Sequence, residues 1–170
     1  MTLHLQDNNI ESVWYGPLPE EAPTLVFLHE GLGCVSMWRD FPEKLSRNTG
    51  CGALVFSRRG YGKSKPCQLP RSLDFLHHEA LIELPKILTD YKIREYILIG
   101  HSDGASIALI FGGESSKEEL LGIICEAPHV FCENITILSI KKIKNQYDNG
   151  NLRERFKKYH GGNVDNVFKG

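Results

Sequence analysis

Residues 95–105 read Glu-Tyr-Ile-Leu-Ile-Gly-His-Ser-Asp-Gly-Ala, an apolar run that passes directly into a serine flanked by glycines. Such a run predicts a strand buried on both faces of a sheet, and the small residues from Ala105 onward predict a helix. Gly100 and Gly104 are needed because side chains there would collide where the strand and the helix cross. A serine on so sharp a turn adopts a strained backbone conformation, and we therefore expect Ser102 to be a nucleophile.

The rest of the chain alternates strands and helices around this turn. Residues 2–6 and 10–15 alternate polar and apolar side chains, which predicts an antiparallel hairpin at a sheet edge. Further buried strands are predicted at residues 23–28, 52–56 and 120–125. The alternation predicts an α/β fold class: a mostly parallel sheet with helices on both faces.

Two helices are predicted within this alternating region. The first spans Met37 to Arg47 with Ser36 as its cap and Phe41 facing inward, and Pro42 should break or restart it. The second begins at Ser72 or Asp74 and reaches about Tyr91, and Pro85 should kink it.

The pattern changes after Pro128. Asn134 is predicted to cap a helix that runs from Ile135 to about Tyr147, and a second helix should end at Gly161-Gly162. No further strand is predicted after Cys125, so the sheet looks incomplete. We expect a core at residues 1–129 followed by the start of a helical cap at residues 130–170.

Three segments together resemble the α/β-hydrolase family, in particular the esterase and C–C hydrolase type with a helical cap. They are Phe-Leu-His-Glu-Gly-Leu-Gly at 27–33, Ser-Arg-Arg-Gly-Tyr-Gly-Lys-Ser at 57–64, and Leu-Ile-Gly-His-Ser-Asp-Gly-Ala at 98–105. The first is similar to the family's oxyanion loop, with Glu30 where glycine is commonest. The second is similar to D-x-R-G-x-G-x-S, with Ser57 in place of the aspartate.

This resemblance implies a serine hydrolase that acts on an ester, amide or related carbonyl substrate. Ser102 would attack the carbonyl carbon and form an acyl-enzyme. The backbone N–H groups of Gly31 and Asp103 would form the oxyanion hole. Gly100 and Gly104 would shape the elbow that presents the serine.

The resemblance also implies a catalytic acid and a histidine after two further strands, and residues 130–170 match neither. We therefore expect this chain alone to be inactive or weakly active. Glu126 ends the strand beside the nucleophile and is a minor candidate for the acid. His129 could contact substrate, but it is not expected to be the base because the family's histidine follows the last strand. The alternative is a non-catalytic remnant or binding module.

Four other polar residues near these motifs are expected to support the structure. His29 should hydrogen-bond within the oxyanion loop, and His101 should pack beside the elbow. Arg58 and Arg59 should brace loops through ion pairs.

Composition limits the partners and the cellular setting. A net charge of −1 and a pI near 6.7 give no reason to expect nucleic acid, and no apolar run approaches the roughly 20 residues that span a bilayer. Five scattered cysteines suggest free thiols in the cytoplasm. No cofactor or metal is expected. The partners we expect are a small-molecule substrate and, because strands are missing, a complementing C-terminal fragment or a second copy.

Overall fold

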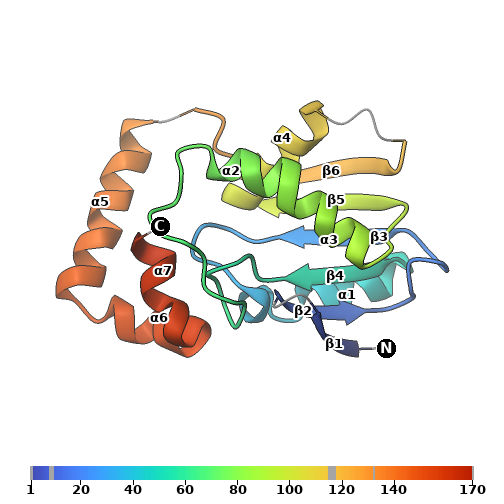
Figure 1. Cartoon of the computed structure of the whole chain (residues 1–170), viewed down its shortest axis with the longest axis horizontal. Helices are drawn as coiled ribbons and strands as arrows, with labels where there is room; N and C mark the ends of the chain where they lie inside the picture. Colours follow the sequence, from blue (N-terminus) through green and yellow to red (C-terminus); the bar gives the residue numbers. More distant parts are fainter. Residues whose placement is uncertain (1, 8–9, 115–117, 132, 170) are drawn as a thin grey trace.

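The computed structural model describes residues 2–7, 10–114, 118–131 and 133–169 (Figure 1). Six strands form one sheet in the order β1-β2-β4-β3-β5-β6. The first two strands form an antiparallel hairpin, β2 runs antiparallel to β4, and the remaining pairs are parallel. The strands are β1 (Thr2–Asp7), β2 (Ile10–Tyr15), β3 (Thr24–Leu28), β4 (Gly52–Phe56), β5 (Tyr96–His101) and β6 (Leu120–Glu126). The predicted hairpin and the predicted parallel strands are confirmed.

Helices cover both faces of this sheet, as predicted. Short helix η1 (Val35–Trp38) and α1 (Phe41–Thr49) lie on one face. The other face is covered by a helical rod made of α2 (Phe75–His78), the π-helical turn η2 (Glu79–Glu83) and α3 (Leu84–Asp90), together with α4 (Asp103–Glu114). The chain then forms α5 (Asn134–Asn149), α6 (Leu152–His160), η3 (Gly161–Asn163) and α7 (Val164–Lys169).

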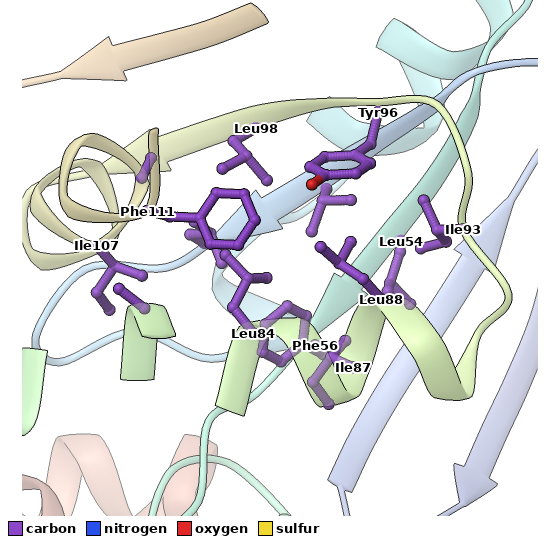
Figure 2. Packing of buried hydrophobic residues seen from close by; sticks show 14 of the residues in the cluster. Leu54, Phe56, Leu84, Ile87, Leu88, Ile93, Tyr96, Leu98, Ile107 and Phe111 are labelled. Atoms are coloured by element: carbon purple, nitrogen blue, oxygen red, sulfur yellow. The ribbon is translucent and has the colours of Figure 1, made fainter. Parts of the chain in front are cut away.

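The larger apolar core lies between the sheet and the helices α3 and α4. Figure 2 shows Leu84 and Leu88 of α3 and Phe111 of α4 turned toward Leu54 and Leu98 of the strands. All five side chains are buried, and each full burial of such a side chain is worth about 1.5–3 kcal/mol. This core fixes α4 against β5 and so positions the turn between them.

The predicted start of the first helix, at Met37, is wrong: the structure has the short helix η1 there, and α1 begins at Phe41. Pro42 occupies the first turn of α1, where its missing N–H costs nothing, so the proline starts a new helix after η1. Ser36 lies inside η1 and does not cap a long helix. The Phe41 side chain is 47% exposed, because at the helix start it lies at the rim of the core.

Pro85 distorts the second predicted helix, as expected. A proline ring clashes with the carbonyl four residues earlier, here that of Leu81. The chain accommodates this with the π-helical turn η2, immediately before α3, so that the rod remains continuous from Phe75 to Asp90.

The last three helices lie beyond the end of the sheet toward which β3 and β4 point (Figure 1). His160 of α6 and Asn163 of η3 form hydrogen bonds with the loops that follow β3 and β4. Asn134 is the first residue of α5 and not its cap, which is Glu133, because Glu133 has the extended backbone typical of a cap position.

Strand β6 differs from the fully buried strand expected from its sequence. Leu121 and Ile124 are 51% and 55% exposed on one face, whereas Ile123 packs against the α4 side. No strand is paired to the outer edge of β6 among the described residues. The outermost strand β6, here called the apolar edge, therefore presents apolar side chains on its open face to solvent.

Candidate active site

The turn between β5 and α4 places Ser102 in a strained conformation. Its φ is 54°, in the left-handed region that residues other than glycine rarely adopt. The Ser102 N–H donates to Glu126 O of β6 over 2.8 Å, and the Ser102 carbonyl accepts the N–H groups of Ala105 and Ser106, each at 3.0 Å. These bonds hold the strained residue in place and stabilise the start of α4.

Gly100 and Gly104 permit this turn because neighbouring backbones touch them. A Cβ on Gly104 would lie 1.9 Å from the carbonyl oxygen of Leu28, and one on Gly100 would lie 2.4 Å from the oxygen of Gly104. Real Cβ contacts are never so short, and backbone atoms cannot rotate away. The close crossing predicted from the sequence is therefore present at both glycines.

The structure brings His129 to the serine. The His129 Nε2 atom lies 2.8 Å from Ser102 Oγ, within the range for proton transfer. The segment reaches this position because β6 ends at Glu126 and Ala127 then turns with a φ of 48°. Sequence analysis placed His129 near the substrate but did not expect it in the role of a base.

Ser106 holds the backbone of His129 over the serine. Its Oγ accepts the His129 N–H at 3.0 Å and donates to the His129 carbonyl at 3.0 Å. Ser106 lies in the first turn of α4, and its N–H donates to the Ser102 carbonyl, so it is next to the serine. Sequence analysis missed Ser106, since a serine in a small-residue helix carries no distinguishing pattern.

Glu126 contributes its backbone to the site. Its carbonyl accepts the N–H of Ser102, but its side chain is exposed and makes no hydrogen bond or ion pair among the described residues. The structure thus does not bring the Glu126 carboxylate to His129, and a role as catalytic acid gains no support from these contacts.

The glycine-rich loop after β3 lies against the start of α4. A Cβ on Gly31 would be 2.8 Å from the Asp103 carboxylate, so the two predicted oxyanion-hole residues are neighbours. The Asp103 N–H is at a helix start, where the first amides have no acceptor within the helix. The Asp103 carboxylate also lies 3.9 Å from the guanidinium of Arg58. That Gly31 and Asp103 bind an oxyanion remains a prediction.

His29 and Arg58 form a buried polar cluster under this loop. His29 Nε2 accepts the Arg58 N–H at 3.0 Å, so its Nδ1 donates to Glu30 O at 2.7 Å. Burial, followed by the nearby Arg58 charge, holds the pKa of His29 well below its usual value. Arg58 donates to the carbonyl oxygens of His29 and Glu30. Both residues therefore brace the loop, as predicted, and the neutral His29 is engaged at both nitrogens.

Two neighbouring residues were predicted to support the structure. His101 lines a cavity of about 180 Å³ together with Glu30, Cys34 and Trp38, and its packing beside the elbow remains a prediction. Arg59 pairs with Glu83 at 3.7 Å and so links its loop to the helical rod on the sheet. Burial raises the pKa of the Glu30 carboxyl.

His160 connects the last helices to two of the three motif segments. Its Nδ1 accepts the Gly62 N–H at 3.0 Å, so its Nε2 donates to Leu32 O, also at 3.0 Å. The side chain is 2% exposed, and burial lowers its pKa. No sequence pattern indicates this structural role of His160.

Glu11 of β2 takes the place expected for the aspartate of the second motif. Its carboxylate accepts the Ser57 hydroxyl at 2.7 Å and the Lys63 N–H at 2.9 Å. Ser64 Oγ in turn accepts the Glu11 N–H at 2.9 Å. The loop thus contacts a half-buried carboxylate although Ser57 stands where an acid is commonest, a contact that only the pairing of β2 with β4 reveals.

We searched the described residues for metal sites, membrane-spanning helices and free thiols. No group of three or more His, Cys, Asp and Glu side chains is arranged to hold a metal there, and no described helix has the length and apolar character to cross a membrane. Cys34, Cys51, Cys67 and Cys125 carry free thiols, and Cys132 lies outside the described residues.

The family model for the alpha/beta hydrolase fold matches residues 23–167 of this sequence. The chain belongs to the α/β-hydrolase family. The match includes the elbow, the glycine-rich loop and the helices α5 and α6. No curated protein sequence matches this α/β hydrolase significantly.

Solved structures share the fold of this α/β hydrolase at low sequence identity. An α/β hydrolase enzyme, MGS-M2, from a Medee basin deep-sea metagenome library is 18% identical, with a TM-score of 0.66 over 93% of this chain and 55% of that one. A Paleococcus ferrophilus monoacylglycerol lipase is 17% identical, with a TM-score of 0.59 over 79% of this chain and 50% of that one. The epoxide hydrolase VrEH1 from Vigna radiata is 18% identical, with a TM-score of 0.60 over 88% of this chain and 45% of that one. This chain thus spans about half the length of these relatives.

Proposed function

We propose that this α/β hydrolase uses Ser102 as the nucleophile of a serine hydrolase acting on an ester, amide or related carbonyl substrate. The observation that carries the proposal is the strained Ser102 at the β5–α4 turn, held by backbone bonds on both sides. Strain of this kind costs about 1–3 kcal/mol and persists where the surrounding structure enforces it. It keeps the hydroxyl on the outside of the turn, half-buried and facing His129.

In the proposed reaction, Ser102 Oγ forms a bond to the carbonyl carbon while its proton leaves to a base. The electron pair of the C=O bond moves to oxygen, and the amides of Gly31 and Asp103 would donate to it. Each such donor is typically worth about 10²–10³ in turnover. The tetrahedral intermediate then expels the alcohol or amine, and water hydrolyses the acyl-enzyme. The lipase among the structural neighbours is compatible with this class of substrate.

A fluorophosphonate probe tests the nucleophile directly. We expect the 170-residue chain to form a covalent adduct at Ser102, detected by peptide mass spectrometry, and Ser102→Ala to lose it completely. Ser36→Ala, at an exposed position in η1, is the matched control and should label like the unaltered chain. An adduct elsewhere, or none in the folded chain, would refute the proposal.

The second candidate is a non-catalytic binding module that keeps the pocket without turnover. It is favoured by one observation: no described carboxylate hydrogen-bonds to His129, so the arrangement lacks a third member. Hydrolysis of a short p-nitrophenyl ester separates the two. Turnover by the chain that Ser102→Ala abolishes would contradict the binding module.

We also propose that the apolar edge at β6 is covered by a complementing fragment or by a second copy of the chain. Leu121 and Ile124 project from the outermost strand, and an exposed apolar strand of this kind promotes association.

Replacing both residues, Leu121→Lys with Ile124→Lys, should weaken self-association of the isolated chain at least about tenfold, because charged side chains replace the apolar surface that the outermost strand exposes. Sedimentation velocity over a concentration series measures this. Leu73→Lys, at a fully exposed leucine outside the sheet, should leave association unchanged. Equal association of the double variant and the unaltered chain would exclude this edge as the contact.

A further inference from the structure

We propose that a cavity between the loop after β4 and the helical rod binds a small zwitterion, whose carboxylate pairs with Arg71 and whose ammonium group pairs with Glu79. The cavity has a volume of about 400 Å³, within the range of roughly 300–1,000 Å³ that is typical of small-molecule sites. All of its lining residues lie between Arg59 and Glu83, so the site is built from one continuous segment of this chain. The inference goes beyond the proposed hydrolysis and does not depend on Ser102.

The first support is an arginine that is fixed in place but incompletely bonded. The guanidinium carbon of Arg71 lies 4.7 Å from the centre of the Tyr61 ring and 5.5 Å from that of Phe75. Its Nη2 donates to Arg59 O at 3.3 Å. Its Nε is buried and has no hydrogen-bond partner among the described residues, although buried donors are nearly always bonded. A guanidinium held in this way is suited to a carboxylate.

The second support is a carboxyl group on the wall of the same cavity. Glu79 is the first residue of the π-helical turn η2, and its side chain makes no hydrogen bond or ion pair among the described residues. Burial raises the pKa of this carboxyl, although the charges of Arg58 and Arg71 oppose the shift. A ligand ammonium group would replace the hydration that burial removes from the carboxylate.

The charges of the wall determine which kind of ligand fits. Arg59 and Glu83 pair with each other at 3.7 Å, so they largely compensate one another. Arg71 and Glu79 are the other formal charges of the wall, and they have opposite signs. A simple anion would meet the like charge of Glu79, and a simple cation would meet that of Arg71. A molecule that carries both charges can satisfy both side chains.

The remainder of the wall is partly apolar and indicates the rest of the ligand. Pro66, Pro70 and Phe75 line the cavity beside the charged groups. Small-molecule sites commonly combine such apolar walls with a few polar groups that fix the orientation of the ligand. An α-amino acid with an apolar side chain has the required chemistry, and L-leucine is a suitable probe.

Isothermal titration calorimetry of the 170-residue chain with L-leucine tests the proposal. We expect saturable binding with a Kd on the order of 1 mM or tighter. 4-Methylpentanoate lacks the ammonium group and 3-methylbutylamine lacks the carboxylate. Each should bind at least about tenfold more weakly, because one charged hydrogen-bonding group of the wall loses its partner. No saturable binding of L-leucine, or equal binding of all three compounds, would overturn the proposal.

Two variants assign the charges to their side chains. Glu79→Gln and Arg71→Gln should each weaken L-leucine binding at least about tenfold. Glu79→Gln should not weaken binding of 4-methylpentanoate, which has no ammonium group, whereas damage to the fold would weaken both ligands. Glu95→Gln and Arg155→Gln, at exposed positions outside the cavity, are the matched controls and should bind like the unaltered chain. Far-UV circular dichroism establishes that each variant is folded.

Cys67 provides a second, independent measurement of occupancy. Its thiol lines the cavity beside Arg71: a Cβ on Gly60 would lie 2.5 Å from Cys67 Sγ and 3.0 Å from Arg71 Nη2. L-leucine at about ten times its Kd should slow alkylation of Cys67 by iodoacetamide about tenfold, because only the unoccupied fraction reacts. Cys51, half-buried outside the cavity, should react at an unchanged rate in peptide mass spectrometry. Protection of both thiols, or of neither, would contradict binding in this cavity.

Discussion

Gly104→Ala is expected to destabilise the chain by at least about 3 kcal/mol, because the new methyl group has no space. Its Cβ would lie 1.9 Å from the Leu28 carbonyl oxygen and 2.8 Å from the His29 carbonyl oxygen. Both are backbone atoms of the segment that leads from β3 into the glycine-rich loop. Relief would require α4 to move away from the sheet, which would open the core around Phe111.

The same helix offers a matched control. Gly113 is exposed near the end of α4, and a Cβ there would meet nothing within 4 Å. Gly113→Ala should therefore stabilise the chain by about 0.5–1 kcal/mol, the usual gain from replacing a helical glycine. Urea unfolding followed by circular dichroism measures both variants. If Gly104→Ala unfolds at the same urea concentration as Gly113→Ala, the close crossing of α4 and β3 is incorrect.

His160→Ala is expected to cost about 3 kcal/mol of unfolding free energy. The change leaves the Gly62 N–H and the Leu32 carbonyl without their partners, and each buried group left unpaired costs about 1–3 kcal/mol. Part of the cost falls on the loop that holds Gly31. His77→Ala, at an exposed site, should stay within about 0.5 kcal/mol of the unaltered chain.

The contribution of His160 should also depend on pH. Burial lowers its pKa in the folded chain below the ordinary value of 6.5, because the charged ring loses its hydration. Stability from the neutral ring is therefore complete above about pH 6.5 and is lost as the pH falls through the folded pKa. His160→Gln has no group that titrates there.

We expect the stability difference between the unaltered chain and His160→Gln to shrink from pH 7.5 to pH 5, measured by urea unfolding at each pH. The buried His29 shifts in the same direction and is present in both proteins; His160 is only one of the smaller causes of that shift, after burial and Arg58, so most of the His29 contribution cancels in the difference. A difference that stays constant or grows toward pH 5 would show that His160 is not held neutral by burial.

Much of this protein could be predicted from local sequence because local physics determines it. Apolar runs of about five residues become buried parallel strands, and glycines flank a serine where backbones cross too closely for side chains. Proline positions set the restart at Pro42 and the irregularity before Pro85. These features depend on neighbours in the chain, so strands, elbow and hydrolase family were predictable.

The predictions were wrong where the exposure of a side chain depends on residues distant in the sequence. The sequence of β6 is as apolar as that of β5, yet Leu121 and Ile124 lie on an open face because no described element covers them. Likewise, Phe41 begins a helix at the rim of the core, where periodicity alone would place it inside.

The polar contacts of the site were decided by the tertiary structure alone. His129 and Ser102 are 27 residues apart, and only the pairing of β5 with β6 and the turn at Ala127 bring Nε2 to Oγ. His160 is 128 residues from Leu32, and Glu11 is 46 from Ser57. A side chain's hydrogen-bond partner depends on its position in space, which neither composition nor periodicity encodes. Local sequence therefore determined the scaffold and the turn that presents Ser102, and folding determined which side chains surround it.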